Sequence, residues 1–363
     1  MEIAFDCRHY EGDRPCAYHR TEKKTCTCEY YDRVKEKILI IKLGALGDII
    51  RTTSILTKLK EEYPKSHITW ITQSPEILPY TVDNKLKFNM ENFLALLAQE
   101  FDLVLNFDKE RESCSLAKLL NSKKKKGFTL LNGKCHPIDK DSEYKFFMGL
   151  DDEFDKKNTK SYPEQIFEMA GYKFEKKYKY LIDKPPRYEN PFSNEKIIVG
   201  LNTGCSNRWP TRLWPEHKWV SLANELQKNG YNVLLLGGRE EDEKNKRIAE
   251  KSLAKYLGHH SLQAFISIAD LCDLVVTCAT MALHVAIGLN KKVVLFNNIF
   301  NRNEFELYGK GAIVEPDLPC LGCYKREFDE YCPVPNCMEE ISVKSVFDSI
   351  EKLVYEQKVQ SIK

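Results

Sequence analysis

The sequence predicts an α/β protein built from two doubly wound domains. Two observations support this prediction: apolar, strand-like runs alternate with helical patterns, and the alternation stops at a proline-rich linker and then restarts. The linker, KPPRYENPFSNEK at 184–196, is the kind of segment that separates domains. With 363 residues, the chain is long enough for two such domains. We expect an N-terminal domain over 34–185 and a C-terminal domain over 186–341.

The first half reads as strand, helix, strand, helix, strand. An unbroken apolar run at 38–41 has the β-branched content of a buried parallel strand, and a helical pattern follows to about Tyr63. Further strands are predicted at 67–72 and 101–108, with a helix over 92–99 between them. This order predicts a parallel sheet with helices on its faces.

A glycine loop, GALGD, joins the first strand to its helix. Gly44 and Gly47 allow backbone N–H groups to approach a ligand at the carboxyl end of the strand, where open α/β sheets bind ligands. Asp48 opens the helix and is either an acid that stabilises the helix start or a functional carboxylate. The loop lacks the third glycine of the dinucleotide fingerprint, so it does not indicate NAD.

The second half repeats the alternation of strands and helices. Its first two strands each run into a glycine turn, and its helices have the apolar spacing of buried faces. A second doubly wound domain follows from this pattern. The predicted elements are strands at 197–204, 231–238, 274–277 and 293–296, and helices within 214–230 and 262–269.

Charge and hydropathy exclude several classes of protein. The 55 basic residues nearly cancel the 53 acidic ones, so we expect neither a nucleic acid nor an anionic membrane as partner. No apolar stretch approaches the roughly 20 residues that span a bilayer. The amino terminus, MEIAFDCRHY, does not resemble a signal peptide. These features predict a cytoplasmic protein with no transmembrane segment.

Thirteen cysteines need an explanation other than disulfides in a cytoplasmic protein. Four of them fall within 1–33, a segment with almost no aliphatic side chains that cannot build a core alone. Four thiolates would gather such a segment around a tetrahedral ion, with His9 and His19 as substitute ligands. The alternative is a disordered arm with incidental cysteines. We predict a structural zinc or iron site whose ligands are Cys7, Cys16, Cys26 and Cys28.

A second cysteine cluster lies at 317–341, in DLPCLGCYKREFDEYCPVPNCMEEI. A C-x2-C pair followed by two later cysteines is a strong metal signal, and a closed four-cysteine site is structural because it leaves no open coordination position. The segment 342–363 then forms an amphipathic helix that we expect to pack back on the N-terminal domain. The predicted ligands of this cysteine finger are Cys320, Cys323, Cys332 and Cys337.

The segment KLGALGDIIRTTSILTKLKEEYP (42–64) resembles the amino-terminal signature of bacterial heptosyltransferases, glycosyltransferase family 9, with Ser54 where the family usually has proline. The resemblance covers about residues 36–358 and implies the GT-B fold, in which two Rossmann-like domains face a cleft. In the family this aspartate is the proposed general base for the acceptor hydroxyl. The resemblance therefore implies that role for Asp48.

The run NTGCSNRWPTRLWPEHKW (202–219) is similar to the family's carboxyl-domain signature, in which a lysine faces the nucleotide diphosphate. Arg212 stands in its place and keeps the positive charge while adding a planar fork that suits phosphate oxygens. The alternative for Arg212 is an ordinary surface arginine. Thr203 and Gly204, in the loop before it, are expected to contact the nucleotide sugar.

The segment LLLGGREEDEKNKRIAE (234–250) resembles the family's G-G-x-x-E segment, in which a carboxylate reaches the nucleotide ribose. We expect that carboxylate among residues 240–243 and name Glu240 and Glu243; a solvated acidic helix start is the alternative. The segment HSLQAFISIADLCD matches the family's base-lining stretch, which would place His260 near the base.

The segment VTCATMALHVAIGL (276–289) is similar to the family's D-T-x-x-x-H element at a helix start, where backbone N–H groups and the threonine hydroxyl hold the diphosphate. Thr280 and His284 match this element, and Met281 lies between them. Ala279 replaces the aspartate, which is the most informative departure from the family pattern.

The resemblance implies a glycosyltransferase that moves heptose, from ADP-heptose or another nucleotide sugar, to a hydroxyl of a lipopolysaccharide core or a protein acceptor. It implies no catalytic metal. Similar cysteine clusters occur in protein heptosyltransferases whose iron-binding finger supports oligomerisation, so a homo-oligomer is also expected. The alternative, kept open by Ala279, is a catalytically silent sugar-nucleotide binder or scaffold on the same fold.

Overall fold

The computed structural model describes residues 2–205 and 209–360 of the chain. Met1 and residues 206–208 and 361–363 lie outside the described part. The first residue of the predicted cysteine module and the end of the predicted C-terminal helical segment therefore stay untested.

The chain folds into two compact units, each described here by itself. The predicted single boundary near residue 185 differs from this division, because Leu46–Arg51 and Asp151–Tyr162 belong to the second unit. The glycine-loop helix thus contributes its first residues to the second unit. The first unit contains Met1–Ala45, Thr52–Leu150 and Pro163–Tyr178, and the second contains Leu46–Arg51, Asp151–Tyr162 and Lys179–Lys363.

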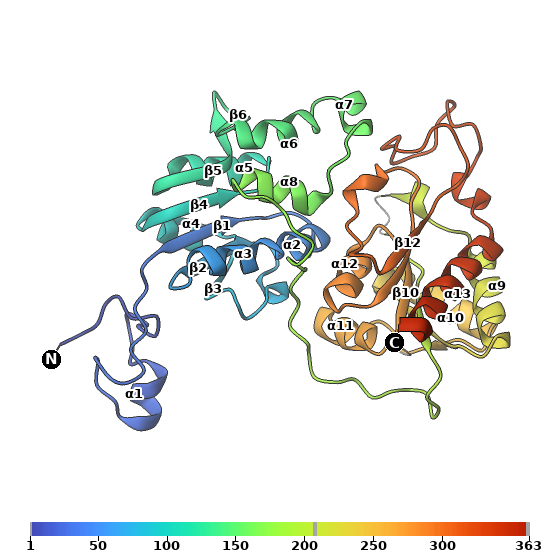
Figure 1. Ribbon diagram of the computed structural model, residues 1–363, viewed down its shortest axis with the longest axis horizontal. Coiled ribbons are helices and arrows are strands. Elements are labelled where there is room, and N and C mark those ends of the chain that lie inside the picture. The colour runs from blue at the N-terminus through green and yellow to red at the C-terminus, as the bar shows by residue number, and fades with distance from the viewer. Residues whose placement is uncertain (1, 206–208, 361–363) are drawn as a thin grey trace. The chain divides into compact units, whose positions relative to one another are not determined.

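The first unit is organised on a six-stranded sheet with the order β3-β2-β1-β4-β5-β6. All neighbouring strands are parallel except β5 and β6, which form an antiparallel pair. The central strands are almost entirely buried, as expected for a parallel sheet covered on both faces (Figure 1). The strands are β1 (Lys37–Ile41), β2 (His67–Thr72), β3 (Asn84–Lys87), β4 (Glu100–Asn106), β5 (Asn121–Leu131) and β6 (Lys134–Pro137).

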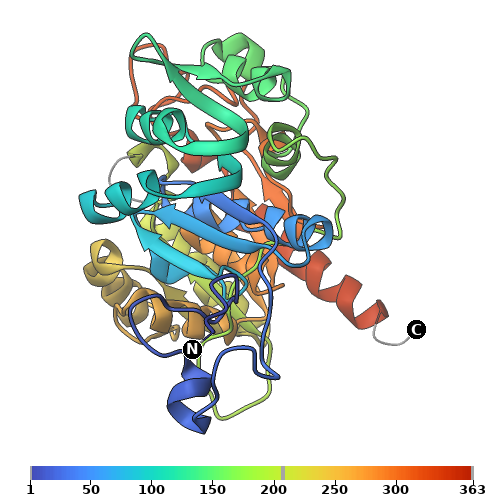
Figure 2. The same cartoon turned by 90° about the vertical axis from the view of Figure 1, so that its left-hand side faces the viewer.

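Two further features of the first unit are a strand that the sequence analysis did not predict and a segment that lies outside the sheet. The lysine run 123–126, for which the sequence analysis predicts no strand, lies within β5, and β5 pairs with β4. The segment 2–33 lies beside the sheet and has no fully buried side chain (Figure 2). It is attached through Arg8, which contacts Asp83 and the Ser66 carbonyl.

Helices of five to nine residues lie between these strands or flank them. The longer ones have buried apolar faces, and Asn89 caps one of them through its side chain. The helices are α1 (Ala17–Glu22), α2 (Leu46–Thr52), α3 (Ile55–Glu62), α4 (Met90–Leu97), α5 (Arg111–Leu119), α6 (Glu143–Phe147), α7 (Asp152–Lys156) and α8 (Tyr162–Met169).

The second unit contains a fully parallel six-stranded sheet with the order β12-β11-β10-β7-β8-β9. Counted from its first strand, this is the strand order of the first sheet. In both sheets the order reverses between the first and fourth strands, and ligands of doubly wound folds bind at the carboxyl ends of those strands. The strands are β7 (Ile198–Asn202), β8 (Asn232–Leu236), β9 (Lys255–Tyr256), β10 (Leu274–Cys278), β11 (Lys292–Phe296) and β12 (Gly311–Val314).

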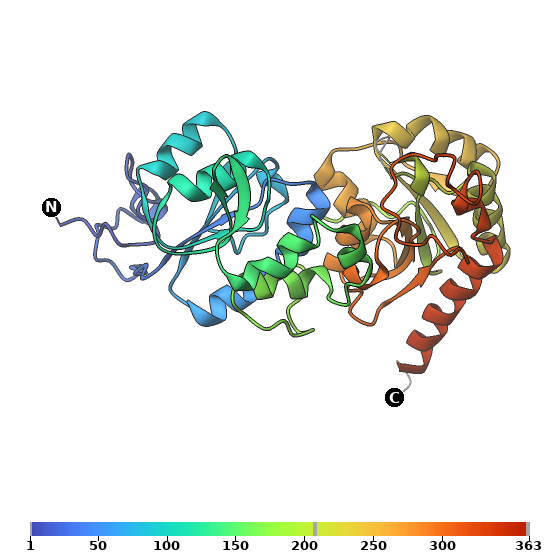
Figure 3. The same cartoon turned by 90° about the horizontal axis from the view of Figure 1, so that it is seen from above.

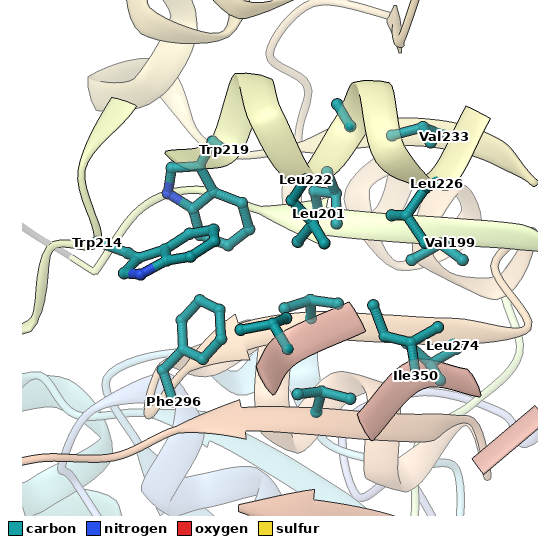
Figure 4. Close-up of a cluster of buried hydrophobic side chains, with 14 of the residues drawn as sticks. Val199, Leu201, Trp214, Trp219, Leu222, Leu226, Val233, Leu274, Phe296 and Ile350 are labelled. Carbon is teal, nitrogen blue, oxygen red and sulfur yellow. The ribbon is translucent and has the colours of Figure 1, made fainter. Parts of the chain in front are cut away.

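The core of the second unit is built around an aromatic cluster. Trp214, Trp219 and Phe296 pack with ring centroids 4.9 to 5.5 Å apart, and aliphatic side chains of α9 and the sheet continue the core (Figure 4).

In residues 2–205 and 209–360, no helix combines the length and apolar content needed to cross a bilayer. The helices are α9 (Glu216–Lys228), α10 (Asp242–Glu250), α11 (Leu262–Asp270), α12 (Met281–Gly288) and α13 (Val343–Gln360).

The C-terminal helix α13 packs within the second unit, alongside its strands (Figure 3). Val346, Ile350 and Leu353 on its apolar face are buried in the same core as the aromatic cluster, and the helix contacts α9, β11 and β12. The apolar face of this helix is thus buried within the second unit, and the expectation that the helix packs on the N-terminal domain stays a prediction. An amphipathic pattern predicts that a face is buried but does not say which surface buries it.

Candidate functional site

The glycine loop of the first unit is held by a buried carboxylate from the neighbouring strand. Asp108, 4% exposed and just beyond β4, pairs with Lys42 and accepts backbone N–H bonds from Leu43 and from Gly44, the latter at 3.1 Å. Both segments leave the carboxyl ends of adjacent strands, so strand order brings them together. Asp108 therefore shapes the glycine loop.

In the second unit, polar side chains join the ends of β7 and β10 at the corresponding place. The Asn202 amide donates to the hydroxyls of Thr277 at 3.0 Å and Thr280 at 3.4 Å, and to the Gly204 carbonyl at 3.2 Å. The Thr280 hydroxyl makes no capping bond to α12, although its backbone is extended as at a helix N-cap. The first N–H groups of α12 therefore receive no side-chain cap from Thr280.

Arg212 is a buried cation beside this helix start. It is 7% exposed, and its guanidinium donates to the carbonyls of Ala279 and Cys205, the latter at 2.8 Å. Its Nε–H is buried without a hydrogen-bond partner, and no carboxylate lies within ion-pair distance among the described residues. Burial lowers the pKa of Arg212. The burial of Arg212 excludes the alternative in which it is an ordinary surface arginine.

The glycine turns after β7 and β8 face a single carboxylate, that of Glu241. Its side chain accepts the Gly238 N–H at 2.9 Å, and a Cβ atom on Gly204 would lie 2.0 Å from its Oε1. Glu240 and Glu243 were named from the sequence; both are exposed, and Glu243 pairs with Lys246. The spacing G-G-x-x-E, counted from Gly237, is the signal that identifies Glu241.

The Asp48 carboxylate belongs to an aromatic and charged cluster of the second unit. Arg51, one helical turn later, pairs with it at 2.7 Å. The Arg51 guanidinium lies 3.4 Å from the ring centroid of Tyr162 and 3.9 Å from a carboxylate oxygen of Glu304. These contacts orient the Asp48 side chain, and the sequence reasoning missed Arg51, Tyr162 and Glu304.

Two predicted residues that are far apart in the sequence, Gly47 and His284, are in contact. A Cβ atom at Gly47 would lie 2.6 Å from His284 Cδ2, so glycine is required for this approach. His284 is 7% exposed, and its Nδ1 has no hydrogen-bond partner among the described residues. Burial, followed by the positive charge of Arg51, lowers the pKa of His284 to about 3, so the ring is neutral at physiological pH.

Comparison with known proteins shows to which family this chain belongs. Residues 92–326, more than half of the chain, match glycosyltransferase family 9 (heptosyltransferase). The chain belongs to this family. The matched range contains Arg212, Glu241 and Thr280 but not Asp48.

Individual relatives of this family 9 chain are distant. It is 27% identical over 109 residues to lipopolysaccharide heptosyltransferase 2 of Escherichia coli (strain K12), and the match spans 28% of this chain and 31% of that relative. The structure of E. coli ADP-heptose lps heptosyltransferase II is similar with a TM-score of 0.60 at 17% identity, covering 89% of this chain and 99% of that one. The bacterial iron-containing dodecameric glycosyltransferase TibC from enterotoxigenic E. coli H10407 gives 0.54 at 13% identity, covering 89% and 77%.

The remaining predicted donor residues of this family 9 chain are Thr203, Met281 and His260. Thr203 is buried and its hydroxyl donates to Asn245 at 2.6 Å, so it supports the loop. Met281 is the first residue of α12. His260 is exposed, contacts Tyr188 and bonds the Leu257 carbonyl, and its role near a base stays a prediction.

The cysteines of each predicted metal site line one cavity. The four N-terminal cysteines, with His9 and His19, line one cavity of about 420 Å³, and the four cysteines of 317–341 line another of about 30 Å³. In residues 2–205 and 209–360, no three Cys, His, Asp or Glu side chains are arranged to hold a metal ion. Cys332 bonds Asp329 and Cys337 accepts from Asn298. Metal binding therefore stays a prediction.

The buried imidazole predicts how stability depends on pH. Because the pKa of His284 falls from 6.5 to about 3 on folding, the unfolded chain binds a proton that the folded chain does not between these values. Its contribution to stability is therefore lost as pH falls below about 6.5, at up to about 1.4 kcal/mol per pH unit. Denaturant unfolding at about pH 7 and about pH 5 should show a smaller pH effect in His284→Asn than in the wild type. His217→Asn, at an exposed histidine, is the control. An unchanged pH effect in the His284 variant would contradict the assignment.

Proposed function

We propose that this chain is an active glycosyltransferase that transfers heptose from ADP-heptose to a hydroxyl of a lipopolysaccharide core or a protein acceptor. The observation that carries the proposal is Arg212, a buried guanidinium with no carboxylate partner among the described residues, beside the start of α12. Leaving a buried charge uncompensated is unfavourable, so the site is suited to a ligand that brings negative charge. A nucleoside diphosphate has that chemistry.

The donor would lie across the carboxyl ends of β7, β8 and β10. Arg212 and the first N–H groups of α12 would hold the diphosphate, because a helix start and a guanidinium both favour phosphate oxygens. Glu241 would accept hydrogen bonds from the ribose hydroxyls, next to Gly204 and Gly238. Glu240, Glu243, His260 and Met281 are weaker candidates for the same donor.

The chemical step forms a bond between the acceptor oxygen and the anomeric carbon and breaks the bond from that carbon to the diphosphate. Asp48, held by Arg51, would accept the hydroxyl proton, and ADP would leave with its added negative charge stabilised by Arg212. Because Arg212 supplies the positive charge, we propose that no catalytic metal is needed. His284, neutral and packed on Gly47, would support the Asp48 segment.

Turnover tests this proposal against the alternative that Ala279 keeps open, a silent sugar-nucleotide binder or scaffold. ADP release from ADP-heptose with an acceptor extract present should be measurable in the wild type. Asp48→Asn should reduce kcat by at least about a hundredfold, because it removes the base, while ADP binding is retained. Asp6→Asn, at an exposed acid of the first segment, is the control. Tight ADP binding by the wild type without turnover would contradict the enzyme proposal and favour the binder.

We also propose that the two cysteine clusters bind structural zinc or iron. The support is that each set of four thiols lines one cavity, and that the segment 2–33 folds without a fully buried side chain to stabilise it. The proposal includes a metal-supported homo-oligomer, because the chain is similar to an iron-containing dodecameric glycosyltransferase.

Metal analysis of the purified full-length protein checks the clusters separately. We expect zinc or iron at about one ion per cluster, because four thiolates suit one tetrahedral ion. Cys16→Ser should lower the metal content by the ion bound at the first cluster. Cys323→Ser should lower it by the ion bound at the second cluster. Cys272→Ser, at a lone buried cysteine, should leave the content unchanged. Protein free of both metals when purified under reducing conditions would refute this assignment.

A further inference from the structure

A second cation lies at the same loop as Arg212. Lys244, in the first turn of α10, is half-buried and donates to the Thr203 carbonyl at 2.7 Å. Arg212 donates to the Cys205 carbonyl two residues further along this loop. The two cations therefore bind the two ends of the loop 203–205, with Gly204 between them.

These two cations differ from Lys42 and Arg51, which each have a carboxylate partner. Lys42 pairs with Asp108, and Arg51 pairs with Asp48. Within the described residues, Lys244 has no carboxylate at ion-pair distance, and the Thr203 carbonyl is its hydrogen-bond acceptor. An ammonium has three donors, so two of the three have no acceptor within the described protein.

Two buried thiols, those of Cys205 and Cys278, lie near enough to both cations to be affected by their charge. Both Arg212 and Lys244 act electrostatically on Cys205 and on Cys278. Burial raises the pKa of Cys205 to about 11, so this thiol is protonated and does not neutralise either cation. Burial also lowers the pKa of Lys244, which is the expected effect when an ammonium is removed from water without a full counter-charge.

We propose that Lys244 is a second positioning residue for the diphosphate of the donor, at the other end of the loop from Arg212. The proposal rests on the nucleotide-sugar function above and extends it. Two cations at a helix start and a glycine loop match the charge of a diphosphate better than one. Glu241, one turn before Lys244 on the same segment, would then meet the ribose while Lys244 meets the adjoining phosphate.

Calorimetric titration with three probes tests the assignment. ADP, inorganic pyrophosphate and adenosine are titrated into the wild type and into Lys244→Gln. We expect ADP and pyrophosphate to bind at least about tenfold more weakly to the variant, because a charge-assisted hydrogen bond is lost, and adenosine to be unaffected. Lys244→Arg should restore most of the ADP affinity because it keeps the charge.

Lys246→Gln is the matched control, since Lys246 lies on the same helix and is exposed and paired with Asp242 and Glu243. It should bind all three probes as the wild type does. An equal loss of adenosine and ADP affinity in Lys244→Gln, or no loss at all, would overturn the role of Lys244. Wild-type protein that binds pyrophosphate but not ADP would leave the anion site standing and refute the nucleotide-sugar function. Wild-type protein that binds neither would refute both.

Discussion

Within the described residues, the guanidinium of Arg212 is buried and donates to carbonyl oxygens and not to a carboxylate. An uncompensated charge in such a place destabilises the folded protein unless a ligand or solvent meets it. The surrounding structure keeps it there: the Asn202 amide joins the strand ends, and the aromatic core fixes the strands below. Under the proposed function, the site is prepared for an anion before one binds, and preorganised charge of this kind lowers the barrier of a reaction that releases a diphosphate.

The departure at Ala279 has a structural meaning in this setting. Its carbonyl accepts a hydrogen bond from Arg212, so the backbone of residue 279 lies next to the guanidinium. An aspartate there, as in the family pattern, would place a carboxylate beside the cation. Alanine removes that negative charge and leaves the region more positive, which under the proposed function would strengthen diphosphate binding and slow its release through the same attraction.

Local patterns in the sequence predicted the strands that carry the site. The apolar runs before Gly44 and Thr203 became β1 and β7, because a buried parallel strand needs continuous apolar content. The lysine-rich strand β5 was missed because hydrogen bonds to β4, not burial, place it in the sheet. The docking of α13 and the pairing of Arg51 with Tyr162 depend on contacts distant in sequence. That Arg212 has no carboxylate partner within the described part of the chain is likewise visible only when its neighbours are known.

A crystal structure of the protein with ADP tests the account most directly. It predicts diphosphate oxygens within hydrogen-bond distance of the Arg212 guanidinium and of the first backbone N–H groups of α12, with the ribose against Glu241. ADP bound elsewhere, or bound at the sheet with Arg212 still directed only at carbonyl oxygens, would contradict it.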